Sequence, residues 1–251
     1  DVIGPDEYKE HVDNNAYTNY MAHENMRLAA QVIACIRDEK KDIYGKMQKL
    51  MQEEGTSLEQ LEEELKDKMK KLYLPQPDEK TGIIPQFDGY FDLKEIDLSV
   101  YKNASVVGTI FHDYSGEDVQ GMQAGKQADI VELLYQMEDI TTPDNKAKNY
   151  VYYEARTLHD SSLSKAIHSI TACDLGMEKE AYDMFMSAAL TDLGQEMKSS
   201  DAGIHSANMG GVWQDVVMGF GGIRIRDGHL RIAPNCPKQW EKFTYPLYWK
   251  G

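Results

Sequence analysis

The chain has few cysteines and no long apolar run. Its three cysteines, Cys35, Cys173 and Cys236, are widely spaced, and no Cys/His cluster has the spacing of a metal site. We therefore expect reduced, buried thiols, a cytoplasmic location and no metal. No apolar stretch approaches the ~18 residues of a membrane span, and no basic segment followed by an apolar one marks a signal peptide. We expect no membrane partner.

Basic residues are also scarce. The 251 residues include 27 Lys and Arg against 42 Asp and Glu, for a formal net charge of -15. Because proteins bind nucleic-acid backbones through clusters of Lys and Arg, this balance argues against a nucleic-acid partner and disfavours an anionic membrane surface. The hydrophobic content of 41% is that of a globular protein, long enough for one large domain or two small ones.

The chain does contain a succession of amphipathic helical patterns joined by polar loops. Asn14 or Asn15 caps a pattern that runs to about residue 38. Ile43–Glu54 is a second expected helix, and a capping box that begins at Thr56 or Ser57 opens a third. Later helices are expected at Gly125–Glu138, from Pro143 onward, and at Ser161–Leu175, Lys179–Leu193 and Gly203–Phe220.

The hydrophobic period changes to two near the C-terminus. Ile223–Arg226 and Leu230–Ile232 flank Asp227-Gly228, which predicts a β-hairpin. Phe243–Trp249 alternates like a further strand, and the proline-containing segment Leu74–Asp97 is expected to be a long loop. The sequence therefore predicts an all-α body that ends in a β-hairpin.

The segment most suited to catalysis lies within the first twenty residues. A Gly-Pro turn precedes Asp6-Glu7-Tyr8, and His11 and Asp13 follow. A carboxyl group in a partly desolvated loop has a raised pKa and can act as a general acid near neutral pH. The alternative is plain surface charge, with acidic side chains that interact with the positive end of the helix that follows, as suits Asp13.

Three further segments have the composition of binding loops. Lys126 and Gln127 can exchange hydrogen bonds with vicinal sugar hydroxyls, although taken alone the pair fits a solvated helix start better. The run Thr157–Ser164 is too contiguous for a nucleophilic triad and suits an N-cap or an anion seat. In Gly203–Gln214 two adjacent glycines within a helical pattern each cost ~1 kcal/mol relative to Ala, so tight packing or a ligand is expected there. No dinucleotide or P-loop fingerprint is present.

Four ordered motifs carry a resemblance to a known family. GPDEYKEHVDNNAYTNYMA, GKQADIVELL, TLHDSSLSKAIHS and GIHSANMGGVWQDVVMGFGG resemble motifs of glycoside hydrolase family 65, which includes maltose, kojibiose, nigerose and trehalose phosphorylases. The resemblance runs over essentially the whole chain. It implies an (α/α)6 barrel and inverting phosphorolysis of an α-glucosyl disaccharide to β-glucose 1-phosphate, with inorganic phosphate as co-substrate and no cofactor.

The resemblance also implies roles for individual residues. Glu7 matches the family's general acid, and Lys126 and Gln127 match residues that hold the non-reducing glucose. The phosphate-binding segments contain His205, Ser206, Gly210 and Gly211, together with Ser161 and Ser162.

Parts of the family's pattern are missing from this sequence. Residues 1–222 resemble the second half of the catalytic barrel, and residues 223–251 resemble a β-hairpin and the start of a C-terminal β-domain. We expect a longer polypeptide or a second chain to complete the barrel, and a homo-oligomer of the intact protein. Two alternatives stay open: an inverting α-glucoside hydrolase, with Asp160 or Glu154 as a second carboxylate, and a catalytically silent half-barrel.

Overall fold

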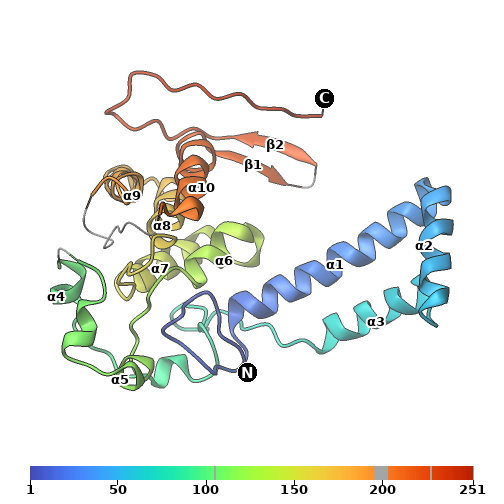
Figure 1. The fold of residues 1–251 in the computed structure, drawn as a ribbon, viewed down its shortest axis with the longest axis horizontal. Helices are drawn as coiled ribbons and strands as arrows, with labels where there is room; N and C mark the ends of the chain where they lie inside the picture. Colours follow the sequence, from blue (N-terminus) through green and yellow to red (C-terminus); the bar gives the residue numbers. More distant parts are fainter. Residues whose placement is uncertain (105, 195–202, 227, 251) are drawn as a thin grey trace.

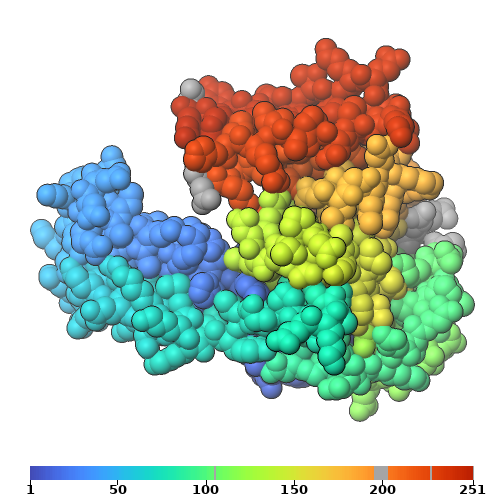
Figure 2. Space-filling model, turned by 180° about the vertical axis from the view of Figure 1, so that it is seen from behind, coloured from blue at the N-terminus to red at the C-terminus, as the bar shows by residue number. Residues whose placement is uncertain are grey.

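The computed structural model describes residues 1–104, 106–194, 203–226 and 228–250 and is mostly helical (Figure 1). Helices α1 (Ala16–Glu39), α2 (Lys41–Glu53) and α3 (Leu58–Lys71) form an arm that extends away from the rest of the molecule (Figures 1 and 2). α1 and α3 pack against each other. Within the described ranges, no helix is both long and apolar enough to cross a membrane.

Local capping begins the arm helices where the sequence predicts. The Asn15 side chain accepts a hydrogen bond from the Thr18 amide at 2.9 Å and caps α1. Ser57 accepts from the Gln60 amide at 3.1 Å and caps α3, so Ser57 is the correct start of the predicted capping box. Both predicted helices are confirmed to within a few residues.

The body of the molecule is built around α8 (Ser164–Asp174), which is buried over nearly its whole length. It packs against α6 (Ile130–Gln136), α9 (Glu178–Ala189), α10 (Ser206–Gln214) and the π-helical turn η4 (Asp215–Phe220). α7 (Pro143–Glu154) begins with Pro143 in its first turn, as predicted, and Thr142 caps it. The remaining short helices are η1 (Tyr90–Asp92), α4 (Ser99–Lys102), η2 (Thr109–His112), α5 (Gly116–Gln120) and η3 (Glu138–Ile140).

The predicted β-hairpin is present. β1 (Ile223–Arg226) pairs antiparallel with β2 (His229–Ile232), with Ile223 opposite Ile232. Gly228 has a φ of 72°, a left-handed conformation that suits glycine in a tight turn, whereas Asp227 lies outside the described residues. The strand expected at Phe243–Trp249 is wrong: this segment is irregular, and Trp240, which precedes it, packs against Phe185 and Phe220.

Another prediction is wrong at a place that matters for function. Within the expected Gly125–Glu138 helix, only residues 130–136 are α-helical. The Gly125 amide instead donates to the Arg156 carbonyl at 2.8 Å, and the Leu158 amide donates to the Gly125 carbonyl at 2.8 Å. Backbone pairing with this distant segment replaces the first helical turn. Lys126 and Gln127 therefore lie in a bend that precedes α6.

The expectation of buried thiols is confirmed only in part. The structure describes all three cysteines, and each is free of a disulfide. Cys173 is buried in α8, whereas Cys35 and Cys236 are exposed. Cys35 lies on the arm, where few neighbouring elements are available to cover a side chain.

Candidate active site

The buried side chain of Asp6 holds the acid loop, residues 4–9, in place. One carboxylate oxygen of Asp6 accepts from the Lys126 amide at 2.8 Å and from the Tyr8 amide at 3.2 Å. A side chain added at Gly125 would place its Cβ 3.0 Å from the other Asp6 oxygen, so glycine permits the close approach of the two segments. The acid loop and residues 125–129 are thereby joined.

Glu7 projects from this anchored loop. Its side chain is 57% exposed, and it forms an ion pair with Lys126 Nζ. The predicted general acid and one predicted sugar-binding residue therefore lie together. Gln127 is close by, because its side-chain amide donates to the Pro5 carbonyl at 2.6 Å. Three residues singled out from two distant motifs thus meet at one place.

A second buried carboxylate lies beside Asp6. Gln86 Nε2 is 3.2 Å from Asp6 Oδ2 and 3.4 Å from Asp129 Oδ2, and Asn15 Nδ2 donates to the same Asp129 oxygen at 3.1 Å. The other oxygen of Asp129 is buried with no hydrogen-bond partner among the described residues. Burial, reinforced by the neighbouring Asp6 charge, raises the pKa of Asp129 to about 8, so the pair retains a proton at neutral pH.

Tyr8 and Lys9 fix the far side of the acid loop. Lys9 is buried, and its ammonium donates to the carbonyls of Val119 at 2.7 Å and Met122 at 2.5 Å. Burial lowers the pKa of Lys9 to about 8. The Tyr8 hydroxyl donates to Asp160 Oδ2 at 2.7 Å. Glu7 is exposed, but the residues on either side of it are firmly held.

The segment around Asp160 joins the acid loop to the first predicted phosphate segment. The Asp160 amide donates to the Lys126 carbonyl at 3.0 Å. Ser161 and Ser162 follow directly, both partly buried, in the turn before α8. The Ser161 carbonyl accepts from the Ser164 amide at 3.2 Å, which leaves the two serines at the start of this helix.

The second predicted phosphate segment is at the start of α10. His205 Nδ1 lies 2.5 Å from Asp192 Oδ1, and the His205 amide donates to Asp192 Oδ2 at 2.9 Å. Ser206 and Gly210 are exposed, and a Cβ on Gly210 would meet nothing within 4 Å. A Cβ on Gly211 would lie 3.1 Å from Ala166 Cβ on α8. Close helix packing therefore explains Gly211, whereas Gly210 leaves its backbone open.

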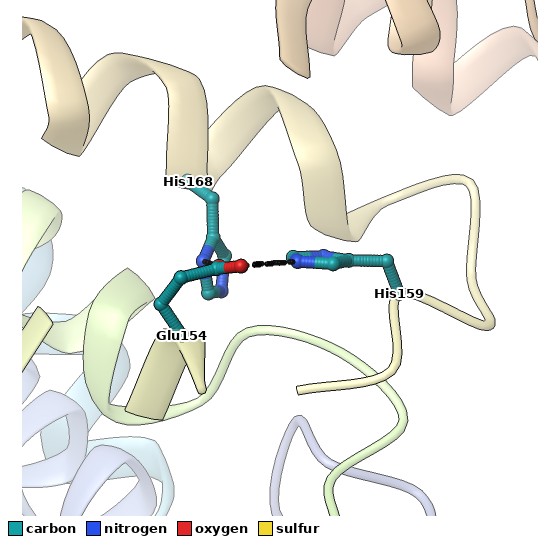
Figure 3. A group of neighbouring side chains, drawn as sticks. All are labelled: Glu154, His159 and His168. Atoms are coloured by element: carbon teal, nitrogen blue, oxygen red, sulfur yellow. Dashed lines mark hydrogen bonds and ion pairs between the residues drawn. The ribbon is translucent and has the colours of Figure 1, made fainter. Parts of the chain in front are cut away.

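The structure also reveals a polar cluster that the sequence did not single out as a unit. Glu154 at the end of α7, His159 in the following loop and His168 in α8 point toward one another (Figure 3). Their candidate ligand atoms lie within 4.8 Å of one another, a spacing that would suit a metal ion. The available sequence signal was weak: a single histidine within the otherwise apolar pattern of α8.

Comparisons with known proteins agree with these motifs. Residues 1–214 match the model of the glycosyl hydrolase family 65 central catalytic domain, and residues 223–251 match that of the family's C-terminal domain. A kojibiose phosphorylase from Halothermothrix orenii is 45% identical over 100% of this chain and 31% of its own length. An α,α-trehalose phosphorylase from Thermoanaerobacter brockii is 37% identical over 100% of this chain and 31% of its own.

A solved structure assigned as a kojibiose phosphorylase from the human microbiome has the same fold. Its TM-score is 0.76 at 31% sequence identity, and the match covers 95% of this chain and 32% of that chain. The chain thus spans about a third of the length of the relatives it matches.

Proposed function

The chain belongs to glycosyl hydrolase family 65, and from that premise we propose that it carries the acid side of a disaccharide phosphorylase site. Glu7 protonates the glycosidic oxygen of an α-glucosyl disaccharide, and phosphate attacks the anomeric carbon from the opposite face. The products are β-glucose 1-phosphate and the released sugar. The contact between Glu7 and Lys126 carries this proposal, because it joins the two predicted substrate-facing motifs.

The ion pair also places the proposed acid beside the proposed glucose-binding residues. Lys126 contacts Glu7, and Gln127 donates to the carbonyl of Pro5 in the same loop. A glucose unit held by Lys126 and Gln127 therefore lies next to the carboxyl group that protonates the glycosidic oxygen.

The surroundings of the two candidate bases favour phosphate over water as the nucleophile. An inverting hydrolase needs a free second carboxylate to activate water. Glu154 contacts Lys102, His159 and His168, and although burial alone would raise the pKa of Glu154, the two imidazoles hold it well below its usual value. Asp160 accepts from the Tyr8 hydroxyl and from the Gly108 amide at 2.9 Å. Phosphate is already an anionic nucleophile, so it needs no general base and only hydrogen-bond donors to bind it.

We assign those donors to the loops at the ends of α8 and α10: Ser161, Ser162, His205, Ser206 and the open backbone at Gly210, with Gly211 allowing close packing. The two helices approach each other at Gly211 and Ala166, which supports a shared seat. No cofactor enters this chemistry, in which phosphate is a substrate.

The same family membership supports a proposal for the architecture. Residues 1–222 form the second half of an (α/α)6 barrel, and residues 223–251 open a C-terminal β-domain. A further segment or a second chain completes the barrel in an oligomeric cytoplasmic enzyme. Two observations support this: the chain spans about a third of its relatives, and the arm carries exposed apolar side chains, including Leu28, Val32 and Leu50.

The test uses the complete enzyme that contains this chain. It is incubated with kojibiose, nigerose, trehalose or maltose, with and without phosphate, and β-glucose 1-phosphate and free glucose are quantified. Product that depends on phosphate supports the proposal. Equal release of glucose without phosphate identifies a hydrolase, and a folded complete enzyme that turns over none of these sugars identifies a silent barrel.

A further inference from the structure

The turn that follows α9 contains a carboxylate that contacts the second predicted phosphate segment. Asp192 lies in this turn, and His205 immediately precedes α10, which packs against α9 (Figure 1). Asp192 Oδ1 lies 2.5 Å from His205 Nδ1, and Asp192 Oδ2 accepts from the His205 amide at 2.9 Å. The two oxygens of one carboxylate therefore hold both the imidazole and the backbone of the same residue.

This pair is part of a fixed junction between α9 and α10. The side chain of Asp192 is 14% exposed, whereas that of His205 is 34% exposed. Nearby, the buried side chain of Asn208 donates to the Ala188 carbonyl at 2.8 Å and ties α10 to the end of α9. The two contacts together fix the start of α10, and His205 with it, against the end of α9.

The contact with Asp192 determines which nitrogen of His205 carries a proton. The hydrogen bond from His205 holds the pKa of Asp192 below its ordinary value, so this carboxylate is charged at neutral pH. Because a charged carboxylate can only accept, Nδ1 must be the donor. The second ring nitrogen, Nε2, is then the one that can meet a ligand, and a second proton on the ring must bind there.

A protonated Nε2 is the kind of donor that phosphate requires. Phosphate oxygens accept their strongest hydrogen bonds from charged donors. An imidazole with both nitrogens protonated carries a positive charge, which the Asp192 carboxylate balances on one side and phosphate on the other. The Ser206 hydroxyl and the open backbone at Gly210 belong to the same end of α10.

From this geometry we infer that Asp192 is a positioning residue: it orients the His205 imidazole so that Nε2–H donates to phosphate. The inference rests on the proposed phosphorolysis. Asp192 itself does not touch phosphate, because both of its oxygens are engaged by His205 and its charge would repel the anion.

Two simpler roles for Asp192 predict different outcomes. A carboxylate at the start of a helix stabilises that helix through its backbone amides, which would make Asp192 important for folding alone. A negative charge near the phosphate-binding site would by itself weaken phosphate binding, so its removal would lower the KM for phosphate. The positioning role predicts a change of the opposite sign, because loss of the carboxylate releases the imidazole.

The test replaces Asp192 in the complete enzyme. Asp192→Asn leaves one acceptor where there were two, so the side chain cannot hold both the His205 amide and Nδ1–H. We expect the KM for phosphate to rise roughly tenfold, as for the loss of a charge-assisted hydrogen bond. The KM for the disaccharide and kcat should change by less than about twofold.

Asp183→Asn is the matched control. It removes the same charge from α9, where Asp183 forms an exposed ion pair with Lys179 at 2.5 Å. The KM for phosphate should stay within about twofold of the wild-type value, because Asp183 bonds to Lys179 and not to the imidazole. A tenfold rise in this variant would mean that charge on α9 in general, rather than the contact with His205, governs phosphate binding.

A second variant protects the test if Asp192→Asn fails to fold. In Asp192→Ser the hydroxyl can accept from the His205 amide, as serine does at helix starts, but Nδ1 loses its carboxylate. This variant should reproduce the rise in phosphate KM. If Asp192 acts through His205, adding Asp192→Ser to His205→Gln should raise the phosphate KM little further. A full additional tenfold rise would contradict the inference.

The outcomes separate this inference from the proposed function. A wild-type enzyme that shows no phosphate dependence contradicts the proposed function itself. A phosphate-dependent wild type whose folded Asp192→Asn or Asp192→Ser variant keeps or lowers the phosphate KM overturns the positioning role. An equal rise in the KM values for phosphate and disaccharide would overturn it as well, in favour of a role in helix stability alone.

Discussion

The two sides of the candidate site are held in different ways. The acid side consists of residues 4–9 with Lys126 and Gln127, and the phosphate side consists of the segments that begin α8 and α10. On the acid side, Asp6 bonds to Lys126, Gln86 and Tyr8, so buried polar groups fix a loop that has no regular secondary structure. On the phosphate side, His205, Ser206 and Gly210 lie at the exposed start of a helix that is held by packing against α8. A loop needs such a network because it lacks a regular backbone ladder, whereas a helix end comes with its amides already aligned.

This difference predicts that acid-side changes alter chemistry and that phosphate-side changes alter binding or packing. Glu7→Gln should have the largest effect on the catalytic rate. It removes the proton donor but keeps the size of an exposed side chain, so kcat should fall by ~10²–10⁴ while Tm stays constant. Steady-state rates and thermal melts of the complete enzyme check this. Full retained activity would exclude Glu7 as the acid.

Asp129→Asn tests the buried carboxyl pair through its pH dependence. Burial raises the pKa of Asp129 in the folded state to about 8, above the ordinary value of 3.8, so the folded state binds a proton that the unfolded state releases. The free energy of unfolding of the wild type therefore falls as pH rises from about 4 to 8, by up to roughly 1.4 kcal/mol per unit from this group. Asn does not titrate, so the variant should lose that slope.

Denaturant unfolding at pH 5, 6.5 and 8 measures the slope directly. Asp215→Asn is the matched control, since burial also raises the pKa of Asp215 to about 8 but this residue lies on η4 and bonds to Ser169. Both variants should flatten the pH dependence, and only Asp129→Asn should alter kcat. An unchanged slope in Asp129→Asn would mean that the pair does not retain a proton.

Gly211→Val tests whether packing organises the phosphate side. A Cβ at this position already lies 3.1 Å from Ala166, so the larger side chain should separate α8 from α10 and cost ~1–3 kcal/mol of unfolding free energy. Chemical denaturation gives the value. An unchanged free energy of unfolding would show that α8 and α10 separate easily and that the phosphate-binding site is not rigid.

Gly210→Ala should give the smallest change in stability and the clearest test of binding. Its Cβ would enter open space, so removing glycine from a helix should stabilise the protein by ~0.5–1 kcal/mol. If the exposed backbone contacts phosphate, the KM for phosphate should rise while kcat changes little. An unaltered KM would remove Gly210 from the seat.

Much of the helical framework could be predicted from local patterns. Asn15 and Ser57 cap the helices that follow them, Pro143 starts another helix, and the change of period marks the hairpin. These predictions succeeded because a cap or a tight turn is decided by residues within four positions of one another. Residues 125–129 were predicted as helix because their alternative partner lies far along the chain, at Arg156 and Leu158.

The candidate site also has a part that could be predicted from local sequence and a part that depends on long-range contacts. The motifs alone identified Glu7, Lys126 and the two phosphate segments, but they did not indicate that Glu7 pairs with Lys126 or that Glu154 binds His159. Asp6 and Lys126 are separated by 120 residues, and polar groups that meet over such distances leave no hydrophobic period to detect.

The sequence by itself determined the helices, the hairpin, the acidic surface charge and the family. Each of these depends on neighbouring residues or on a motif that is read in order. The tertiary structure alone decided the surroundings of the carboxylates of the candidate site. It buries Asp6 beside Asp129 and leaves Glu7 exposed. It also places Glu154 against Lys102 and Asp160 against the Tyr8 hydroxyl. The physical reason is that burial and hydrogen bonding, which set the protonation of a carboxyl group, depend on segments that only folding brings together.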